Sequence, residues 1–188
     1  MAKLILFNKP FQVLSQFRDA GGRRTLADFI DVPGVYPAGR LDYDSEGLLL
    51  LTDDGALQAR IADPRFKMVK QYRVQLEGEV TTQALTSLQR GIELKDGPAR
   101  ALRAAEIDPP PLWPREPPIR ERRNQRTSWV EIHLDQGRNR QVRRMTAAVG
   151  FPTLRLVRWR IGDWSVDQIQ LGAHQALNLH LGRPPRPR

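Results

Sequence analysis

The chain contains no cysteine, and its only histidines are His133, His174 and His180. The lack of cysteine excludes disulfide bonds, zinc sites with thiolate ligands and cysteine nucleophiles, and it is compatible with a reducing compartment. The histidines do not occur in a His-Glu-x-x-His spacing, which argues against a zinc hydrolase.

Long apolar runs are also missing. No stretch of about 18 apolar residues and no signal-peptide pattern occurs, so we expect a protein that does not enter a membrane and acts in the cytoplasm. The 188 residues suit one domain, or two lobes that share a cleft, with a buried core. No coiled-coil pattern or long apolar stripe is present, and we therefore expect a monomer.

Lysine is absent after Lys95, yet the chain carries a net charge of +9. Residues 1–110 hold equal numbers of basic and acidic side chains, whereas residues 111–188 hold 15 arginines and 6 carboxylates. A guanidinium contacts phosphate through two hydrogen bonds and stacks on planar bases. This arginine excess indicates nucleic acid as the partner, with an anionic membrane surface as the alternative.

A loop rich in carboxylates precedes the most apolar segment of the chain. It contains Arg40, Asp42, Asp44 and Glu46, and it runs into four consecutive leucines at residues 48–51, which predict a fully buried strand. Carboxylates beside a buried strand need basic partners, because an unpaired charge is costly to desolvate. Arg40 is the nearest candidate, and we expect Asp44 to hold the loop or to pair with Arg40.

Three interpretations of this loop compete. The first is calcium binding, because Asp42, Asp44, Glu46, Gly47 and Asp53 fall at positions 1, 3, 5, 6 and 12 of an EF-hand register. That register lacks the glutamate at its last position, and the prolines just before the loop prevent the preceding helix. The second is an active-site loop in which one aspartate, kept ionised by a basic partner, is a nucleophile or a base. The third is a solvated turn.

Four blocks of sequence resemble the RsuA-type RNA pseudouridine synthases. Residues 39–55 read GRLDYDSEGLLLLTDDG, residues 70–74 read KQYRV, residues 137–145 read GRNRQVRRM and residues 154–158 read LRLVR. The Asn-Lys-Pro at the end of the first predicted strand also fits, although Gln12 stands where that family has glycine. The resemblance extends over roughly residues 4–177.

The resemblance implies that the protein isomerises uridine to pseudouridine in RNA, a rearrangement that requires no metal and no cofactor. It assigns the catalytic carboxylate to Asp42, which attacks ribose C1′, attacks uracil C6 or removes the 2′ proton; the sequence leaves these routes open. It assigns to Arg143 the role of the basic partner that lowers the pKa of Asp42. Tyr72 would stack on the uracil and assist loss of the C5 proton, Leu156 would contact the base, and Arg40 would occupy the space that an extruded base leaves.

The expected fold is α+β, with a mixed, mainly antiparallel sheet, flanking helices and a central cleft lined by the carboxylate loop. We expect residues 1–181 to form the catalytic domain and residues 182–188 a disordered basic tail. Predicted strands cover residues 3–7, 70–77 and 128–134, and predicted helices cover residues 25–30, 54–62, 81–91 and 139–149. Related enzymes commonly carry an S4-like domain ahead of the catalytic one, and we expect that domain to be absent here.

Residues 108–118 contain six prolines and Trp113, which predict a long surface loop. We expect RNA contacts from this loop and from the third block, through Arg120, Arg122, Arg123, Arg138, Arg140 and Arg144. The loop resembles that of the RluE subfamily, which implies one uridine in domain V of 23S ribosomal RNA, near the peptidyl-transferase centre, in free RNA or in an assembling large subunit. The alternatives are small-subunit rRNA, tRNA, or a non-catalytic RNA-binding assembly factor.

Overall fold

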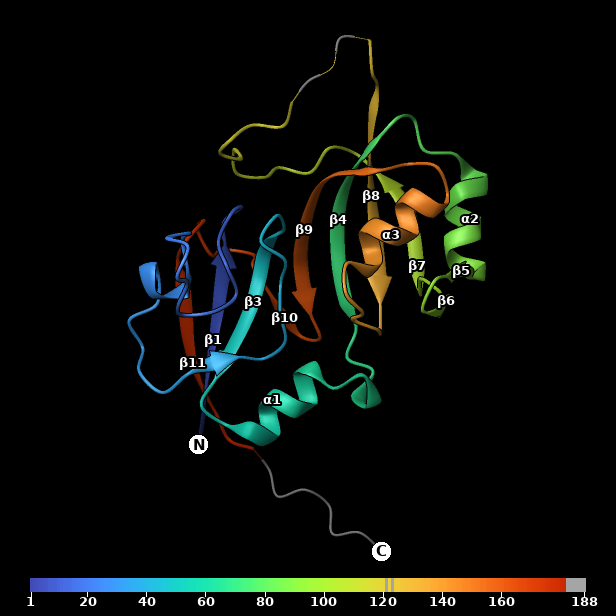
Figure 1. The fold of residues 1–188 in the computed structure, drawn as a ribbon. Coiled ribbons are helices and arrows are strands. Elements are labelled where there is room, and N and C mark those ends of the chain that lie inside the picture. Colours follow the sequence, from blue (N-terminus) through green and yellow to red (C-terminus); the bar gives the residue numbers. More distant parts are fainter. Residues whose placement is uncertain (121, 123, 182–188) are drawn as a thin grey trace, which may run out of the picture.

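The structure of the chain is a computed structural model, and it describes residues 1–120, 122 and 124–181. The predicted basic tail at residues 182–188 lies outside the described residues. A nine-stranded sheet, with the main order β11-β1-β3-β9-β4-β8-β7, runs through the molecule (Figure 1). The α+β fold with a mixed, mainly antiparallel sheet is confirmed.

The strands of the large sheet are β1 (Ala2–Lys9), β2 (Tyr36–Pro37), β3 (Glu46–Thr52), β4 (Lys70–Glu77), β7 (Arg103–Ile107), β8 (Thr127–Leu134), β9 (Thr153–Ile161), β10 (Trp164–Ser165) and β11 (His174–Leu179). A separate hairpin consists of β5 (Ile92–Leu94) and β6 (Gly97–Ala99). The α-helices are α1 (Gly55–Ala62), α2 (Thr82–Arg90) and α3 (Gln141–Ala148), and the 3₁₀ turns are η1 (Leu26–Asp28) and η2 (Pro64–Phe66). None of the described helices is long and apolar enough to cross a membrane.

The four leucines form a strand that is buried on both faces, as predicted. Leu48 and Leu50 pack in one apolar cluster with α1, whereas Leu49 and Leu51 pack in another with Phe7 of β1. Alternation of side chains across a strand sends neighbouring residues to opposite faces, and a continuous apolar run therefore requires cover on both.

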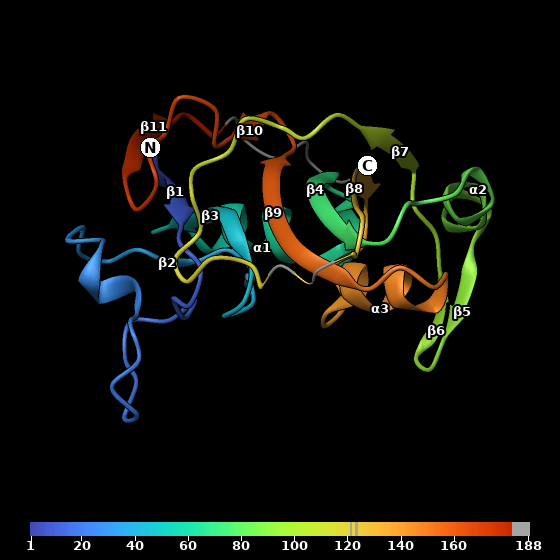
Figure 2. The ribbon, with the colours of Figure 1, turned by 90° about the horizontal axis from the view of Figure 1, so that it is seen from above.

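The helices predicted at residues 54–62 and 81–91 are confirmed, whereas the one predicted at residues 25–30 is the short 3₁₀ turn η1. The Asp54 carboxylate caps α1 by accepting a hydrogen bond from the Leu57 N–H at 2.7 Å, and the hydroxyls of Thr25 and Thr81 cap η1 and α2. The third helix, which covers one face of β4 and β8 (Figures 1 and 2), begins two residues later than predicted, at Gln141. Arg140 adopts a left-handed conformation with φ of 49° and lies outside that helix.

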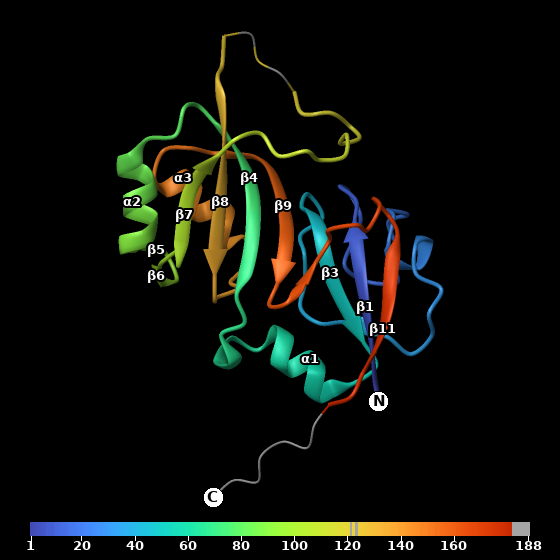
Figure 3. The same cartoon turned by 180° about the vertical axis from the view of Figure 1, so that it is seen from behind.

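The sheet has a seam where β3 and β9 run parallel over two residue pairs, while the other strand pairs are antiparallel (Figure 3). Gly47 makes this close approach possible. A Cβ atom at Gly47 would lie 2.3 Å from the Arg158 carbonyl oxygen, and its φ of 102° also favours glycine. The seam therefore depends on one residue without a side chain.

A proline-rich loop, defined as residues 108–126 between β7 and β8, crosses this seam (Figure 2). The Trp113 indole stacks on Trp159 with ring centroids 6.4 Å apart, and its N–H donates to Glu46 at 2.8 Å. Arg155 donates two hydrogen bonds of 2.9 Å to the same carboxylate. Farther along the loop, the Arg115 guanidinium lies over the Phe11 ring. The loop thus fastens the two halves of the sheet together.

We predict that Glu46→Gln lowers the free energy of unfolding by about 3 kcal/mol, because it leaves Arg155 buried without its counter-charge. The double variant Glu46→Gln/Arg155→Met should lose less than the sum of the two single variants, since the two side chains contact each other. Urea unfolding measures these values, and the exposed Glu93→Gln is the control. A Glu46→Gln variant as stable as Glu93→Gln would contradict the prediction.

Candidate active site

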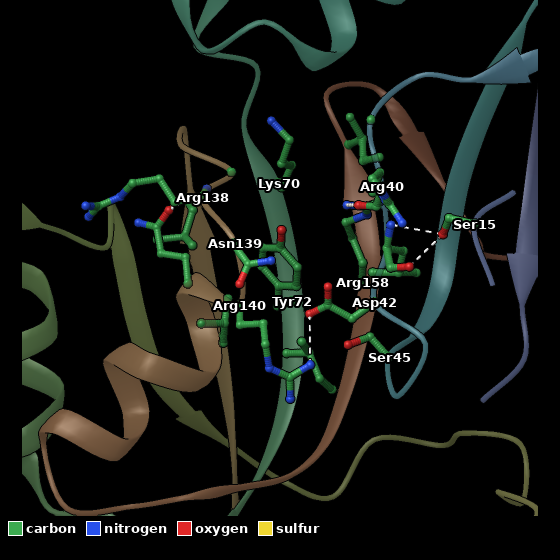
Figure 4. A pocket seen from close by; sticks show the side chains of 18 of the residues that line it. Ser15, Arg40, Asp42, Ser45, Lys70, Tyr72, Arg138, Asn139, Arg140 and Arg158 are labelled. Atoms are coloured by element: carbon green, nitrogen blue, oxygen red, sulfur yellow. Dashed lines mark hydrogen bonds and ion pairs between the residues drawn. The ribbon is translucent and has the colours of Figure 1, made fainter. Parts of the chain in front are cut away.

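A cleft of about 620 Å³ lies between the carboxylate loop and the segment that leads into α3. Its floor is formed by side chains of β4 and β9, and Figure 4 shows them between the two walls. The volume is in the range of pockets that hold small ligands, about 300–1,000 Å³. The expected central cleft is therefore present, and it contains Asp42, Tyr72, Leu156, Arg40, Arg138 and Arg140.

The carboxylate loop is held by hydrogen bonds from the first turn of the chain. The Ser15 hydroxyl donates to the Leu41 carbonyl at 2.6 Å and accepts from the Leu41 N–H at 3.1 Å. The Gln12 N–H donates to the Tyr43 carbonyl at 2.8 Å. Gln12 has a φ of 57°, in the left-handed region that glycine adopts most easily, and this explains the glycine of the resembled pattern at that position.

Asp42 faces the cleft beside the ring of Tyr72 (Figure 4), and its carboxylate lies 3.5 Å from the Arg140 guanidinium. Arg143, the expected basic partner of Asp42, interacts with it electrostatically, but its guanidinium is in ion-pair contact with Asp44 and not with the Asp42 carboxylate. Arg140, in its left-handed conformation ahead of α3, reaches across the cleft to this carboxylate instead. Arg143 lies on the helix behind it and contacts the backbone of the loop.

Asp44 links the carboxylate loop to the start of α3. Its carboxylate accepts two hydrogen bonds from Arg140, at 2.9 and 2.8 Å, and lies 3.5 Å from Arg143. Arg143 also donates to the Asp44 carbonyl at 2.7 Å and to the Ser45 hydroxyl at 3.2 Å. Burial alone would raise the pKa of Asp44, but the hydrogen bond from Arg140 and the positive charges of Arg143 and Arg140 together outweigh burial and hold the pKa below its usual range. Of the two roles expected for Asp44, the contacts agree with holding the loop, and its partners are Arg140 and Arg143 rather than Arg40.

The floor beside Asp42 is apolar. Tyr72 and Leu156 are buried, with 7% and 5% of their surfaces exposed, and both belong to the apolar cluster that α3 completes with Val142. Tyr72 lies opposite Arg158 in the β4–β9 pairing. An aromatic ring and an aliphatic side chain therefore offer a flat surface to a planar base.

The other arginines expected to bind RNA fall into two groups. Arg138 and Arg144 both pair with Asp96 in the turn between β5 and β6, at 3.0 and 2.7 Å. Arg144 therefore points to the β5–β6 hairpin.

Arg120 and Arg122 line a second hollow of about 720 Å³ beneath the proline-rich loop. Arg122 lies 3.3 Å from Glu77, and both residues line that hollow. Arg123 lies outside the described residues.

Three cations near the site received no role from the sequence: Lys9, Lys70 and Arg158. The Lys9 side chain is fully buried behind the carboxylate loop and donates to the carbonyls of Pro10 and Val13 at 2.9 and 2.7 Å. Burial lowers its pKa from 10.5 to about 7. All three lie in the sequence segments that resemble the family. Their place in those segments was the signal from which a role at the site could have been predicted.

No group of three or more histidine, aspartate or glutamate side chains that could hold a metal ion occurs in the described part of the chain. The calcium interpretation of the carboxylate loop is not supported, because Asp44 is bound to two arginines.

The family model described as RNA pseudouridylate synthase matches residues 3–148. A crystal structure described as pseudouridylate synthase superimposes with a TM-score of 0.78 at 29% identity, and the match covers 95% of this chain and 71% of that one. The chain therefore belongs to the RNA pseudouridylate synthase family, and it is an RNA pseudouridine synthase.

Two of the proteins that are similar to this chain have the same name. "Ribosomal large subunit pseudouridine synthase E" of Xanthomonas axonopodis pv. citri (strain 306) is 54% identical over 98% of this chain and 99% of its own length. The protein of that name from Vibrio parahaemolyticus serotype O3:K6 is 52% identical over 94% of this chain and 74% of its own length. "Ribosomal large subunit pseudouridine synthase B" of Bacillus subtilis (strain 168) is 33% identical over 93% of this chain and 68% of its own length.

We predict that Lys9 makes stability depend on pH. Its pKa is lower in the folded chain than in the unfolded chain, so unfolding binds a proton between about pH 7 and 10. The unfolding free energy of the wild type should therefore rise, relative to Lys9→Met, as the pH increases from 7 to about 10. Urea unfolding at pH 7, 8 and 9 measures this difference. The exposed Lys67→Met should show none, and equal pH slopes for wild type and Lys9→Met would contradict the prediction.

Proposed function

We propose that this enzyme isomerises one uridine of 23S ribosomal RNA to pseudouridine, in domain V near the peptidyl-transferase centre. The observation that carries the chemistry is the Asp42 carboxylate beside the ring of Tyr72, in a cleft with room for a nucleotide (Figure 4). The names of the large-subunit relatives and the proline-rich loop support the choice of RNA. The substrate is free 23S RNA or an assembling large subunit.

Asp42 acts on the ribose or the base while the uracil stacks on Tyr72, and Tyr72 assists loss of the C5 proton. Arg140 places its positive charge 3.5 Å from the Asp42 carboxylate. Arg143 is a basic partner of Asp42, with which it interacts electrostatically, and its bonds to Asp44 and Ser45 fix the backbone that carries Asp42. Leu156 contacts the base.

RNA binding uses the basic surface around the cleft. Arg40 is exposed at the mouth of the cleft and is placed to fill the position of an extruded base. Arg120, Arg122 and Arg123 contact phosphates from the proline-rich loop, while Arg138 and Arg140 contribute charge from the opposite wall of the cleft and Arg144 adds charge beside the β5–β6 hairpin. The enzyme acts as a monomer in the cytoplasm and uses no cofactor.

Asp42→Asn should abolish isomerisation and leave RNA affinity within about threefold, because the amide keeps the shape and loses the negative charge. The measurement is tritium release from 23S rRNA labelled with 5-[³H]-uridine, with 16S rRNA and bulk tRNA in parallel. Filter binding gives the affinity. Full turnover by Asp42→Asn would refute its role, and release from another RNA would keep the chemistry but refute the 23S substrate. An inactive wild type that still binds rRNA would favour the assembly factor.

Arg120→Gln/Arg122→Gln should weaken RNA binding and lower the slope of log Kd against log salt by about one to two, because fewer counterions are released. The matched control is Arg90→Gln/Arg100→Gln, which removes the same charge from exposed sites outside both hollows. Equal slopes for the two double variants would mean that the proline-rich loop makes no phosphate contact.

A further inference from the structure

Arg158 extends from β9 to the floor of the cleft and is only 5% exposed. Its Nε donates to the Leu48 carbonyl at 2.8 Å, and its Nη1 donates to the Arg40 carbonyl at 3.2 Å. Its Nη2 is buried and has no hydrogen-bond partner among the described residues. Buried guanidinium groups normally satisfy their donors, so this nitrogen has capacity for one more acceptor.

Lys70 lines the same cleft from the start of β4. Its ammonium donates to the Met68 carbonyl at 3.1 Å, and its stem lies against Gly137, where a Cβ would come within 3.9 Å of Lys70 Cε. Burial, and then the nearby Arg158, lower the pKa of Lys70 to about 8. Within the described residues, no carboxylate lies within ion-pair distance of this ammonium.

These two cations flank Tyr72. Lys70 precedes it by two residues, on the same face of β4, and Arg158 is its neighbour across to β9. In Figure 4 the Tyr72 hydroxyl and the Lys70 ammonium lie toward the same end of the cleft, while Asp42 lies beside the ring. A base stacked on Tyr72 would therefore have the Asp42 carboxylate on the side of its ribose. The cations Lys70 and Arg158 would lie on the side of the base away from the ribose.

The chemistry of the proposed function supplies a ligand for this pair. When the C1′–N1 bond breaks, its electron pair stays on the uracil, and the negative charge is shared by N1, O2 and O4. In the C1′ route Asp42 forms an ester bond to C1′ as the ring detaches; the ring rotates, C5 attacks C1′, and the bond from C1′ to the Asp42 carboxylate breaks. In the 2′-proton route the detached ring leaves a glycal; C5 adds to C1′, and C2′ takes back its proton. In both routes the C5 proton then leaves to a base, and N1 takes up a proton. No charge or electron is gained overall. The detached ring is the species that most needs positive charge nearby.

Building on the proposed function, we propose that Lys70 and Arg158 form an anion-stabilising recess that holds the carbonyl oxygens of the detached uracil. Neither cation is neutralised by a carboxylate of its own, and a fixed positive charge acts strongly in a cleft that the substrate fills. The recess would favour the routes through C1′ attack or the 2′ proton, since both release a uracil anion.

Lys70 should limit activity at alkaline pH, because only its protonated form carries charge. The charged and titratable groups that face it are Arg158 on β9, Asp135 after β8 and Tyr72 on its own strand, with Arg40, Asp42 and Tyr43 across the cleft. Asp135 is the only one of these that raises the pKa of Lys70, and burial outweighs it.

The absence of cysteine from the chain allows a direct chemical test. Lys70→Cys removes the charge, and alkylation of that single thiol with bromoethylamine restores an ammonium group on a side chain of nearly the same length. The sulfur makes this ammonium more acidic than that of lysine. Tritium release is followed under single-turnover conditions from pH 6 to 9.5, so that the chemical step and the Kd for RNA are separated.

We expect Lys70→Cys to lose about 10²-fold in the single-turnover rate with a Kd within about threefold of the wild type. Aminoethylation should restore the rate, and the alkaline decline should then lie at lower pH than in the wild type. Lys70→Arg, whose side chain does not titrate here, should lack that decline. Lys67→Cys, treated in the same way, is the control for the alkylation.

Three results would overturn this inference while the wild type remains active: a Lys70→Cys rate near that of the wild type, a raised Kd with an unchanged rate, or an alkaline decline that aminoethylation does not move. The second result would assign Lys70 to an RNA phosphate instead. A wild type that releases no tritium from any RNA would overturn the proposed function and this inference together, which distinguishes the two failures.

Discussion

The seam between β3 and β9 is the constraint on which the site depends. Two parallel residue pairs join the halves of the sheet, and backbones can approach there only because residue 47 is glycine. Glu46, the residue before it, is fixed by Arg155 and by Trp113 of the proline-rich loop. Asp42 lies four residues earlier in the same chain segment, so the bonds that close the seam also position the carboxylate.

The electrostatics of the cleft are arranged in two zones. On one side, Asp42 and Asp44 are matched by Arg140 and Arg143. On the other, Lys70 and Arg158 face the cleft with only backbone carbonyls as acceptors. The carboxylates on one side of the cleft are thus paired with positive charge, while Lys70 and Arg158 on the other side have no carboxylate within ion-pair distance among the described residues.

Local sequence features predicted the elements well because their causes are local. The run of four leucines and the capping side chains of Thr25, Asp54 and Thr81 are read within a few residues. The buried pair of Glu46 and Arg155 joins residues 109 apart, and no local pattern indicates it. The contact between Asp42 and Arg140 was missed for a similar reason. In the helix predicted from residue 139, the side chain of residue 140 would point in the direction set by regular helix geometry. The backbone at Arg140 is left-handed instead, and it directs this side chain toward the cleft.

The arginine excess of residues 111–188 was interpreted as a surface for nucleic acid, and much of it is used inside the molecule. Arg138 and Arg144 hold the β5–β6 turn through Asp96, Arg155 holds Glu46, and Arg158 holds two backbone carbonyls. Each of these tasks needs several donors in a fixed plane, which a guanidinium offers and an ammonium does not. That requirement accounts for arginine rather than lysine in the C-terminal part of the fold. The charge left for RNA is therefore smaller than the composition indicates, and it is concentrated around the cleft and the proline-rich loop.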